Sequence, residues 1–236
     1  GTANDTINLV QTTSKWGTDV QARNMGNAGK GATSDEITKI SDYLKHDISI
    51  NTDKGVDTLN ATAGNDALFL QNFSTSGDDL WYKDAGSNSS GARLIGLNKI
   101  NLLEGNNFLD LTSTTTSLSS DTLEITSGSG NDILWLSDAD ETINSGNGDD
   151  QITLNGGTDN LTTGTGKDIL TISNYKGNLT VTDFDVSKDK FDFKAQSNKV
   201  TAVGNKITVS NSLGDYVIIL SNNPDLSDIS SFSTFA

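Results

Sequence analysis

A nine-residue repeat between residues 127 and 171 constrains the fold of this chain more than any other feature. Aligned on its acidic residue, the segment reads SGSGNDILW, LSDADETIN, SGNGDDQIT, LNGGTDNLT, TGTGKDILT. The sixth position of each unit is acidic, and the residues there are Asp132, Glu141, Asp150, Asp159 and Asp168. The eighth position is aliphatic, and the residues there are Leu134, Ile143, Ile152, Leu161 and Leu170. A fixed period of this kind predicts a stacked, repetitive architecture.

Each unit combines a turn with a very short strand. Its glycine-rich half allows the backbone to take positive φ and turn tightly. Its second half places one aliphatic residue inward between two outward-facing neighbours. Two units make one coil, so residues 18 apart lie above one another. The sequence therefore predicts an all-β fold, a right-handed parallel β-roll in which each coil contacts only its neighbours.

Stacking aligns the acidic residues at the two edges of the roll. Asp132, Asp150 and Asp168 fall on one edge, and Glu141 and Asp159 fall on the other. Carboxylates about 4.7–4.9 Å apart, one strand spacing, repel each other unless they are neutralised. The adjacent turns offer backbone carbonyls, and oxygen ligands without sulfur or imidazole suit a hard cation with six or more ligands. Calcium is the ion expected. The alternative is a metal-free solenoid in which Asp and Asn serve only as turn formers.

These units resemble the RTX nonapeptide G-G-x-G-x-D-x-U-x, the calcium-binding β-roll of proteins exported by type I secretion. The resemblance implies that each ion takes ligands from two turns that lie 18 residues apart. One ion would lie between Gly128, Gly130, Asp132 and Ser145, Asn147, Asp150, and a second between Gly146, Gly148, Asp150 and Thr163, Thr165, Asp168. A weaker site on the opposite edge would use Ser137, Ala139, Glu141 with Leu154, Gly156, Asp159. The chain departs from the family where Ser127, Ser145 and Thr163 replace the first glycine, a position at which only the carbonyl is needed.

The N-terminal half is expected to be a less regular solenoid, over residues 1–126. Asp57 and Asp66 lie nine residues apart and are expected on opposite edges, and Asp66 with Asp84 forms a further weak candidate site. Residues 34–46 begin with a capping box and carry apolar residues at helical spacing, which predicts one inserted helix. His46 is expected at its end as a cation. Residues 91–126 predict wider coils without metal, and they resemble segments that precede RTX units in bacterial S-layer proteins and adhesins.

The remaining chain is expected to close the solenoid. After the roll at 127–176, residues 177–221 predict a cap, because an open solenoid end exposes unpaired strand edges. Residues 179–193 resemble the stretch that closes RTX β-rolls, and 199–209 with 215–220 predict an antiparallel hairpin. The polar tail at 222–236 is expected to be flexible, and its place resembles that of a type I secretion signal.

The charge and the cysteine content of the chain narrow the classes of function that it can have. The formal net charge of −15 argues against nucleic acid or an anionic membrane as partner. There is no cysteine, so calcium rather than disulfides is expected to stabilise a secreted chain. No signal peptide or membrane-spanning run is recognised, and the chain is expected to be the C-terminal part of a longer protein.

The function expected is structural: the C-terminal portion of an S-layer protein, secreted by type I machinery, that folds on calcium and self-associates into a lattice at the cell surface. No enzyme activity is expected, because neither His-Glu-x-x-His nor Gly-x-Ser-x-Gly occurs. The alternatives are a secretion appendage of a hydrolase and an adhesin that binds surface polysaccharide. For an adhesin, Trp16, Trp81 and an outward-facing Trp135 are candidate contacts.

Overall fold

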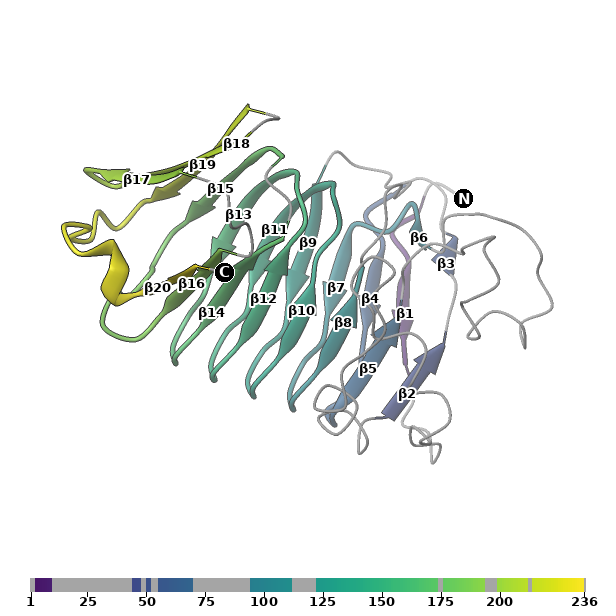
Figure 1. The fold of residues 1–236 in the computed structure, drawn as a ribbon. Helices are drawn as coiled ribbons and strands as arrows, with labels where there is room; N and C mark the ends of the chain where they lie inside the picture. The colour runs from purple at the N-terminus through teal and green to yellow at the C-terminus, as the bar shows by residue number, and fades with distance from the viewer. Residues whose placement is uncertain are drawn as a thin grey trace, which may run out of the picture.

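The computed structural model of this protein describes residues 3–9, 44–47, 50–51, 55–69, 94–111, 122–173, 176–193, 199–211 and 214–235. Within these residues, two long sheets face each other, and the chain passes from one to the other along the axis of a solenoid (Figure 1). The predicted all-β class and the predicted stacking of parallel strands are confirmed.

The first sheet has ten strands. In spatial order they are β1 (Thr6–Asn8), β4 (Thr58–Asn60), β7 (Lys99–Asn101), β9 (Thr122–Thr126), β11 (Asp140–Asn144), β13 (Thr158–Thr162), β15 (Asn178–Val181), β19 (Gly214–Leu220), β18 (Lys206–Asn211) and β17 (Lys199–Val203). Pairing is parallel from β1 to β19, and it is antiparallel between β19, β18 and β17.

The second sheet has eight strands, all paired in parallel. In order they are β2 (Leu44–Asp47), β5 (Asp66–Phe69), β8 (Phe108–Asp110), β10 (Ile133–Trp135), β12 (Gln151–Leu154), β14 (Ile169–Ile172), β16 (Lys190–Phe193) and β20 (Ser233–Phe235). A short parallel pair, β3 (Ile50–Asn51) with β6 (Leu94–Ile95), forms a third sheet.

The core is a stack of inward-facing residues from both sheets. The aliphatic residues at the eighth position of the repeat, Leu134, Ile143, Ile152, Leu161 and Leu170, are all at most 1% exposed. Three of them, Leu134, Ile152 and Leu170, form one inward-facing row of the eight-stranded sheet. This row continues outside the repeat through Leu68, Leu109 and Phe191. Each such side chain contributes about 1.5–3 kcal/mol by leaving water, which explains how a chain with few apolar residues sustains this fold.

The coils have unequal lengths. Stacked turn residues are 18 apart inside the repeat, but 25, 41 and 52 apart closer to the N-terminus. Parallel register is nevertheless kept between the described strands. The N-terminal coils therefore belong to the same two sheets as the repeat.

The predicted helix over residues 34–46 is wrong where the structure tests it. Leu44, Lys45 and His46 lie in strand β2, which pairs in parallel with β5. Strand pairing in the growing sheet overrides the local helical spacing here. Residues 34–43 lie outside the described residues.

The solenoid is closed by aromatic residues and by the antiparallel strands. Phe184 stacks on Phe191 at 4.5 Å between ring centroids, and Phe191 stacks on Phe193 at 5.6 Å. The predicted hairpin is found as β18 with β19, but residues 199–209 also turn at Gly204, which makes three antiparallel strands instead of two.

The C-terminal tail, predicted to be flexible, forms ordered structure. A 3₁₀ turn (Ile229–Ser231) leads into β20, which extends the eight-stranded sheet beside β16. Leu226 and Phe232 are buried at 6% and 2% exposure. The tail is polar on average, and the prediction of flexibility rested on that composition. Two buried apolar residues are nevertheless enough to hold the tail in place.

Candidate cation-binding turns

The predicted ligand residues come together on one edge of the solenoid. The turns at residues 127–132, 145–150 and 163–168 each connect a strand of the ten-stranded sheet to one of the eight-stranded sheet. Backbone bridges link Ser129 to Asn147 and Asn147 to Thr165, so the turns stack in the predicted register. The structure therefore brings the turn of Gly128, Gly130 and Asp132 beside the turn that contains Asp150.

The acids of these turns form a ladder of hydrogen bonds. The backbone N–H of Asp132 donates to Oδ1 of Asp150 at 2.8 Å, and that of Asp150 donates to Oδ1 of Asp168 at 2.9 Å. All three side chains are at most 1% exposed. Each acid thus satisfies a buried backbone donor of the coil before it, in keeping with the role of turn former.

The ladder is longer than the repeat. The N–H of Asp66 donates to Asn107, that of Asn107 to Asp132, and that of Asp168 to Asp189. Sequence reasoning missed Asn107 and Asp189, although Gly105-Asn106-Asn107-Phe108-Leu109 has the spacing of a repeat unit. A search for residues at a fixed period does not find these two positions, because the coils differ in length.

One carboxylate oxygen of each central acid has no hydrogen-bond partner. Oδ2 of Asp132, Asp150 and Asp168 is buried without a protein donor. Burial outweighs the nearby backbone and side-chain donors and raises the pKa of each of the three carboxyls to about 7. A buried carboxylate oxygen without a partner is costly, so a proton, a cation or another donor from outside the chain would stabilise it.

Stacked glycines keep backbone carbonyls next to these acids. A Cβ at Gly130 would lie 2.1 Å from the carbonyl oxygen of Gly105, and one at Gly148 would lie 2.0 Å from that of Gly130. Both glycines have positive φ, at 121° and 130°. The turns therefore require glycine, both for backbone conformation and for the close approach of the preceding carbonyl.

Hydroxyl groups bond to two of the predicted carbonyl ligands. Oγ of Ser127 donates to the carbonyl of Ser145 at 2.7 Å, and Oγ of Ser145 donates to that of Thr163 at 2.8 Å. The carbonyls of Asn147 and Thr165 accept backbone N–H groups at 2.8 Å. Each carbonyl oxygen keeps a second lone pair, so these bonds leave room for metal coordination.

The chemistry of the donor set fits a hard cation that is held partly by the backbone. Among the described residues, no group of three or more His, Cys, Asp or Glu side chains is arranged to hold a metal. An ion at these turns would therefore depend on carbonyl oxygens as well as on the unpartnered carboxylate oxygens, which is the mixed oxygen set that Ca²⁺ accepts.

The opposite edge is built differently. The N–H of Glu141 donates to Oδ1 of Asp159 at 3.0 Å, and Ser137 donates its hydroxyl to Glu141. Burial and the nearby Asp159 raise the pKa of Glu141 well above its ordinary value. In the register of this sheet, Leu123 precedes Glu141 and Leu179 follows Asp159, so the acid column is only two residues long at this point.

The other residues of this weaker site contribute little. Gly156 has no close contact with a neighbouring coil, because a Cβ at this position would lie 3.4 Å from the nearest atom. The glycine that stacks on Ala139 is Gly157, where a Cβ would lie 1.9 Å from the Ala139 carbonyl oxygen. Leu154 belongs to strand β12.

The predicted site of Asp66 with Asp84 involves a residue outside the described part of the chain. Asp66 stacks on Asn107, which is 41 residues further along the chain, and Asp84 lies outside the described residues. Both oxygens of the Asp66 carboxylate accept hydrogen bonds from Thr62. The prediction that Asp57 and Asp66 lie on opposite edges is confirmed, since Asp57 accepts the N–H of Asp5 beside the ten-stranded sheet.

The exposure of Trp135 that an adhesin contact requires is not found, although alternation places this residue on the outer face of its strand. Trp135 is only 6% exposed and packs edge-on against Phe108, with 4.8 Å between ring centroids. Trp16 and Trp81 lie outside the described residues.

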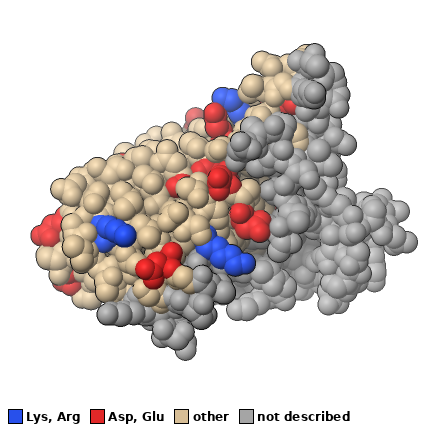
Figure 2. Space-filling view, turned by 90° about the horizontal axis from the view of Figure 1, so that it is seen from above, with Lys and Arg blue, Asp and Glu red and all other residues tan. Residues whose placement is uncertain are grey.

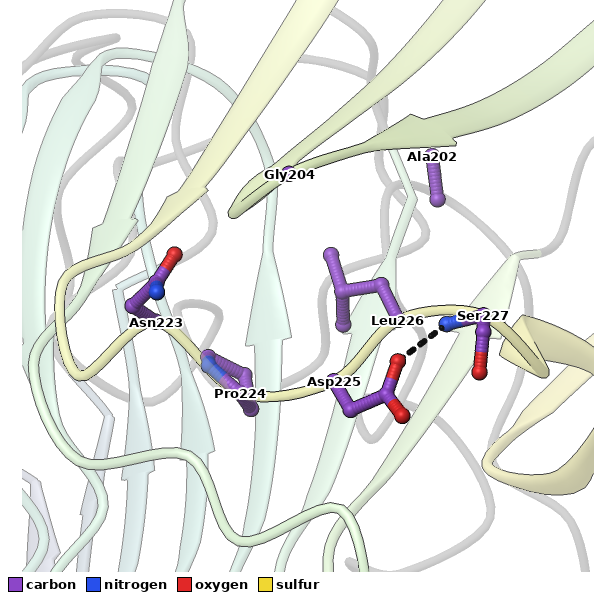
Figure 3. Close-up of a pocket in the computed structure, with 7 residues that line it drawn as sticks. All are labelled: Ala202, Gly204, Asn223, Pro224, Asp225, Leu226 and Ser227. Atoms are coloured by element: carbon purple, nitrogen blue, oxygen red, sulfur yellow. Dashed lines mark hydrogen bonds between the residues drawn. The ribbon is translucent and has the colours of Figure 1, made fainter.

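The remaining surface offers a shallow pocket at the cap. A cavity of about 430 Å³ lies between the β17–β18 turn at Gly204 and the loop from Asn223 to Ser227 (Figure 3). Its one carboxylate, Asp225, accepts the backbone N–H of Ser227 at 2.9 Å. The face in Figure 2 carries its acids in small, separate groups with basic residues between them. Neither feature gathers groups that could act together on a ligand.

Comparison with the models of known protein families and with curated proteins finds no match. Among the described residues, no helix is both long enough and apolar enough to cross a membrane.

Proposed function

We propose that this chain is the C-terminal structural part of a secreted surface protein, most similar in kind to RTX-type S-layer proteins, and that calcium stabilises its solenoid. The observation that carries the proposal is the row of three buried acids, Asp132, Asp150 and Asp168, each with one oxygen that has no protein partner.

The electrostatics of this row support a cation. With pKa values raised to about 7, a large fraction of these carboxyls is ionised in neutral solution even though they are buried. Neighbouring acids also raise the pKa of Asp150 and Asp168 by repulsion. Bound Ca²⁺ would supply positive charge to this row. The ligands would come from the carboxylates and from the carbonyls of Gly128, Gly130, Ser145, Asn147, Gly146, Gly148, Thr163 and Thr165.

The protein contributes the geometry of the site. Positive-φ glycines bring successive turns close together, and the ladder bonds fix one oxygen of each acid so that the other keeps its direction. Because the row joins successive coils, neutralising it stabilises coil stacking. A chain with this property would remain loosely folded where calcium is scarce and would become ordered where calcium is millimolar.

A catalytic role for the ladder acids is disfavoured by their burial. Asp132 and Asp150 are 0% exposed, so a substrate has no path to them. The adhesin alternative also loses its described aromatic contact, because Trp135 packs on Phe108. The structural role therefore remains the best supported of the three.

Thermal unfolding with calcium, with magnesium and with chelator tests the cation. We expect calcium to raise Tm and magnesium to do so much less, because Mg²⁺ demands a smaller octahedral site. Calcium at 100 times its Kd adds about 2.7 kcal/mol to the free energy of unfolding. Identical Tm values in calcium and chelator would overturn the proposal.

Electron microscopy tests the S-layer assignment separately. Calcium is expected to produce ordered sheets or a lattice, and chelator is expected to disperse them. A chain that binds calcium but remains monomeric at high protein concentration would leave the cation site in place and reject the lattice.

A further inference from the structure

Asn107 occupies a rung of the acid ladder. In the parallel pairing of β8 with β10, Phe108 lies beside Ile133, so Asn107 stacks on Asp132. Gly105 and Gly130 are stacked in the same way two residues earlier, because a Cβ at Gly130 would lie 2.1 Å from the Gly105 carbonyl oxygen. The turn ending at Asn107 is therefore the structural counterpart of the turn ending at Asp132.

The protein satisfies both ends of the Asn107 amide. Its Oδ1 accepts the N–H of Asp66 at 3.0 Å, and its Nδ2 donates to the carbonyl of Gly105 at 3.1 Å. Its own N–H donates to Asp132 at 2.6 Å. Asn107 is 0% exposed, and these contacts give both its amide oxygen and its amide nitrogen a protein partner.

At Asp132 the same arrangement lacks the donor. Oδ1 of Asp132 accepts a backbone N–H from the preceding coil, as Oδ1 of Asn107 does. In this stacking Oδ2 is the counterpart of Nδ2, and it is buried without a hydrogen-bond partner. The counterpart of the Gly105 carbonyl in this turn is the carbonyl of Gly130. Two acceptors then take the place of a donor and an acceptor, so a group from outside the chain, such as a proton or a cation, is needed to bridge them.

The other end of the ladder is also satisfied by the protein. Asp189 accepts the N–H of Asp168 on Oδ1 and the N–H of Asp185 on Oδ2, at 3.1 and 2.8 Å. Asp183 accepts the N–H groups of Thr163 and Gly164, both at 2.8 Å. Both ends of the row of unpartnered oxygens are thus bounded by side chains that need no ion.

We propose that the amide of Asn107 is a built-in substitute for the cation on this edge of the solenoid, and that it confines the cation dependence of this edge to the turns of Asp132, Asp150 and Asp168. The turn of Asp66 then stacks on that of Asn107 without an ion. The identity of the ion rests on the proposed function, but the exchange of amide for carboxylate does not.

Two reciprocal variants test whether the amide replaces the cation. Asp132→Asn places an amide in the next coil, where it can donate to Gly130. We expect it to raise Tm in chelator by about 2–4 °C or more and to lower the number of bound calcium ions. Asn107→Asp creates a further unpartnered oxygen, so we expect a lower Tm in chelator and a larger gain in Tm when calcium is added.

Asn160→Asp is the matched control, because Asn160 is exposed on β13 and the change adds the same charge. Equal loss of Tm in chelator for Asn107→Asp and Asn160→Asp overturns the proposal, as does a loss of Tm in Asp132→Asn. If Asn107→Asp folds in neither buffer, Asp132→Asn decides alone. If the wild-type chain ignores calcium, the proposed function fails, yet the order of Tm values in chelator still tests the role of Asn107.

Discussion

Asp150 receives the backbone N–H of Asp132 at 2.8 Å on one carboxylate oxygen, while its other oxygen is buried without a partner. The first contact joins two coils by a hydrogen bond that any carboxylate or amide could accept. The second oxygen lacks a donor among the described protein groups. Glu141 and Asp159 on the opposite edge share this property, but this edge stacks three such acids in successive coils, whereas the opposite edge stacks two.

Substitution of Asp150 separates these two contributions. Asp150→Ala and Asp159→Ala each remove the acceptor of one buried N–H, which costs about 1–3 kcal/mol in either case. Asp150→Ala should in addition weaken the calcium response, because Asp150 belongs to both proposed ion sites. Calcium titration followed by circular dichroism measures this, with the exposed Asp215→Ala as charge control. Equal calcium dependence in the Asp150 and Asp159 variants would contradict the assignment of sites.

The stability of the chain in chelator should depend on pH. Asp132, Asp150 and Asp168 have folded-state pKa values near 7, above their ordinary value of 3.8. Protonation of these groups therefore stabilises the folded state fully below about pH 4, and this stability is lost as the pH rises through 7. Urea unfolding at a series of pH values should show this loss, and saturating calcium should reduce it. Stability in chelator that is constant from pH 5 to 8 would count against the raised pKa values.

Glycine in the turns should be indispensable where coils touch. Gly148→Ala places a Cβ 2.0 Å from the Gly130 carbonyl at a φ of 130°, so both the contact and the backbone are strained. The strained conformation alone costs about 1–3 kcal/mol. Gly204→Ala is the control, since its φ is also positive, at 61°, but no atom lies within 4 Å. Thermal unfolding should rank Gly148→Ala well below Gly204→Ala, and similar Tm values would contradict the close stacking of the turns.

Trp135 should behave as a packing residue. Trp135→Ala removes the edge-on contact with Phe108 and is expected to cost about 3–5 kcal/mol. Trp135→Phe should recover much of this stability because it keeps an aromatic ring beside Phe108. Unfolding in urea measures both variants. If Trp135→Ala remains stable but loses binding to a glycan array, the result would favour the adhesin hypothesis instead.

The tail should contribute to the stability of the closed end. Phe232 is buried and its ring lies 5.9 Å from that of Phe184, so Phe232→Ala is expected to cost about 3–5 kcal/mol. Ser227→Ala, at an exposed position in the same segment, should change little. Proteolysis should remove the tail of the Phe232 variant before that of the wild type, and equal protection would show that β20 is dispensable.

The sequence predicted the features that repeat at short range. Five units in phase were enough to place the aliphatic core residues and to align Asp132, Asp150 and Asp168, since parallel pairing carries an 18-residue period directly into space. Asn107 and Asp189 were beyond this reasoning, because insertions change the spacing to 25 and 21 residues.

Tertiary pairing explains the errors. The apolar spacing before His46 suits a helix, but an available edge of the eight-stranded sheet takes residues 44–47 as a strand. Alternation correctly orients Leu134, whereas Trp135 is buried by a neighbour on the outer face that alternation cannot reveal. The tail was misread for a similar reason, since two apolar residues are sufficient to hold it against an existing sheet edge.

The hydrogen bonds of the ladder all point the same way along the chain. Asp66, Asn107, Asp132, Asp150 and Asp168 each donate their N–H to the residue that follows in the ladder. A turn therefore has its buried donor satisfied only after the next coil has been delivered. A chain that is synthesised or exported from its N-terminus therefore cannot complete the hydrogen bonds of a turn until the next coil is available. Asp189 supplies the last acceptor of the ladder, so the ladder is complete only when the closing segment has folded.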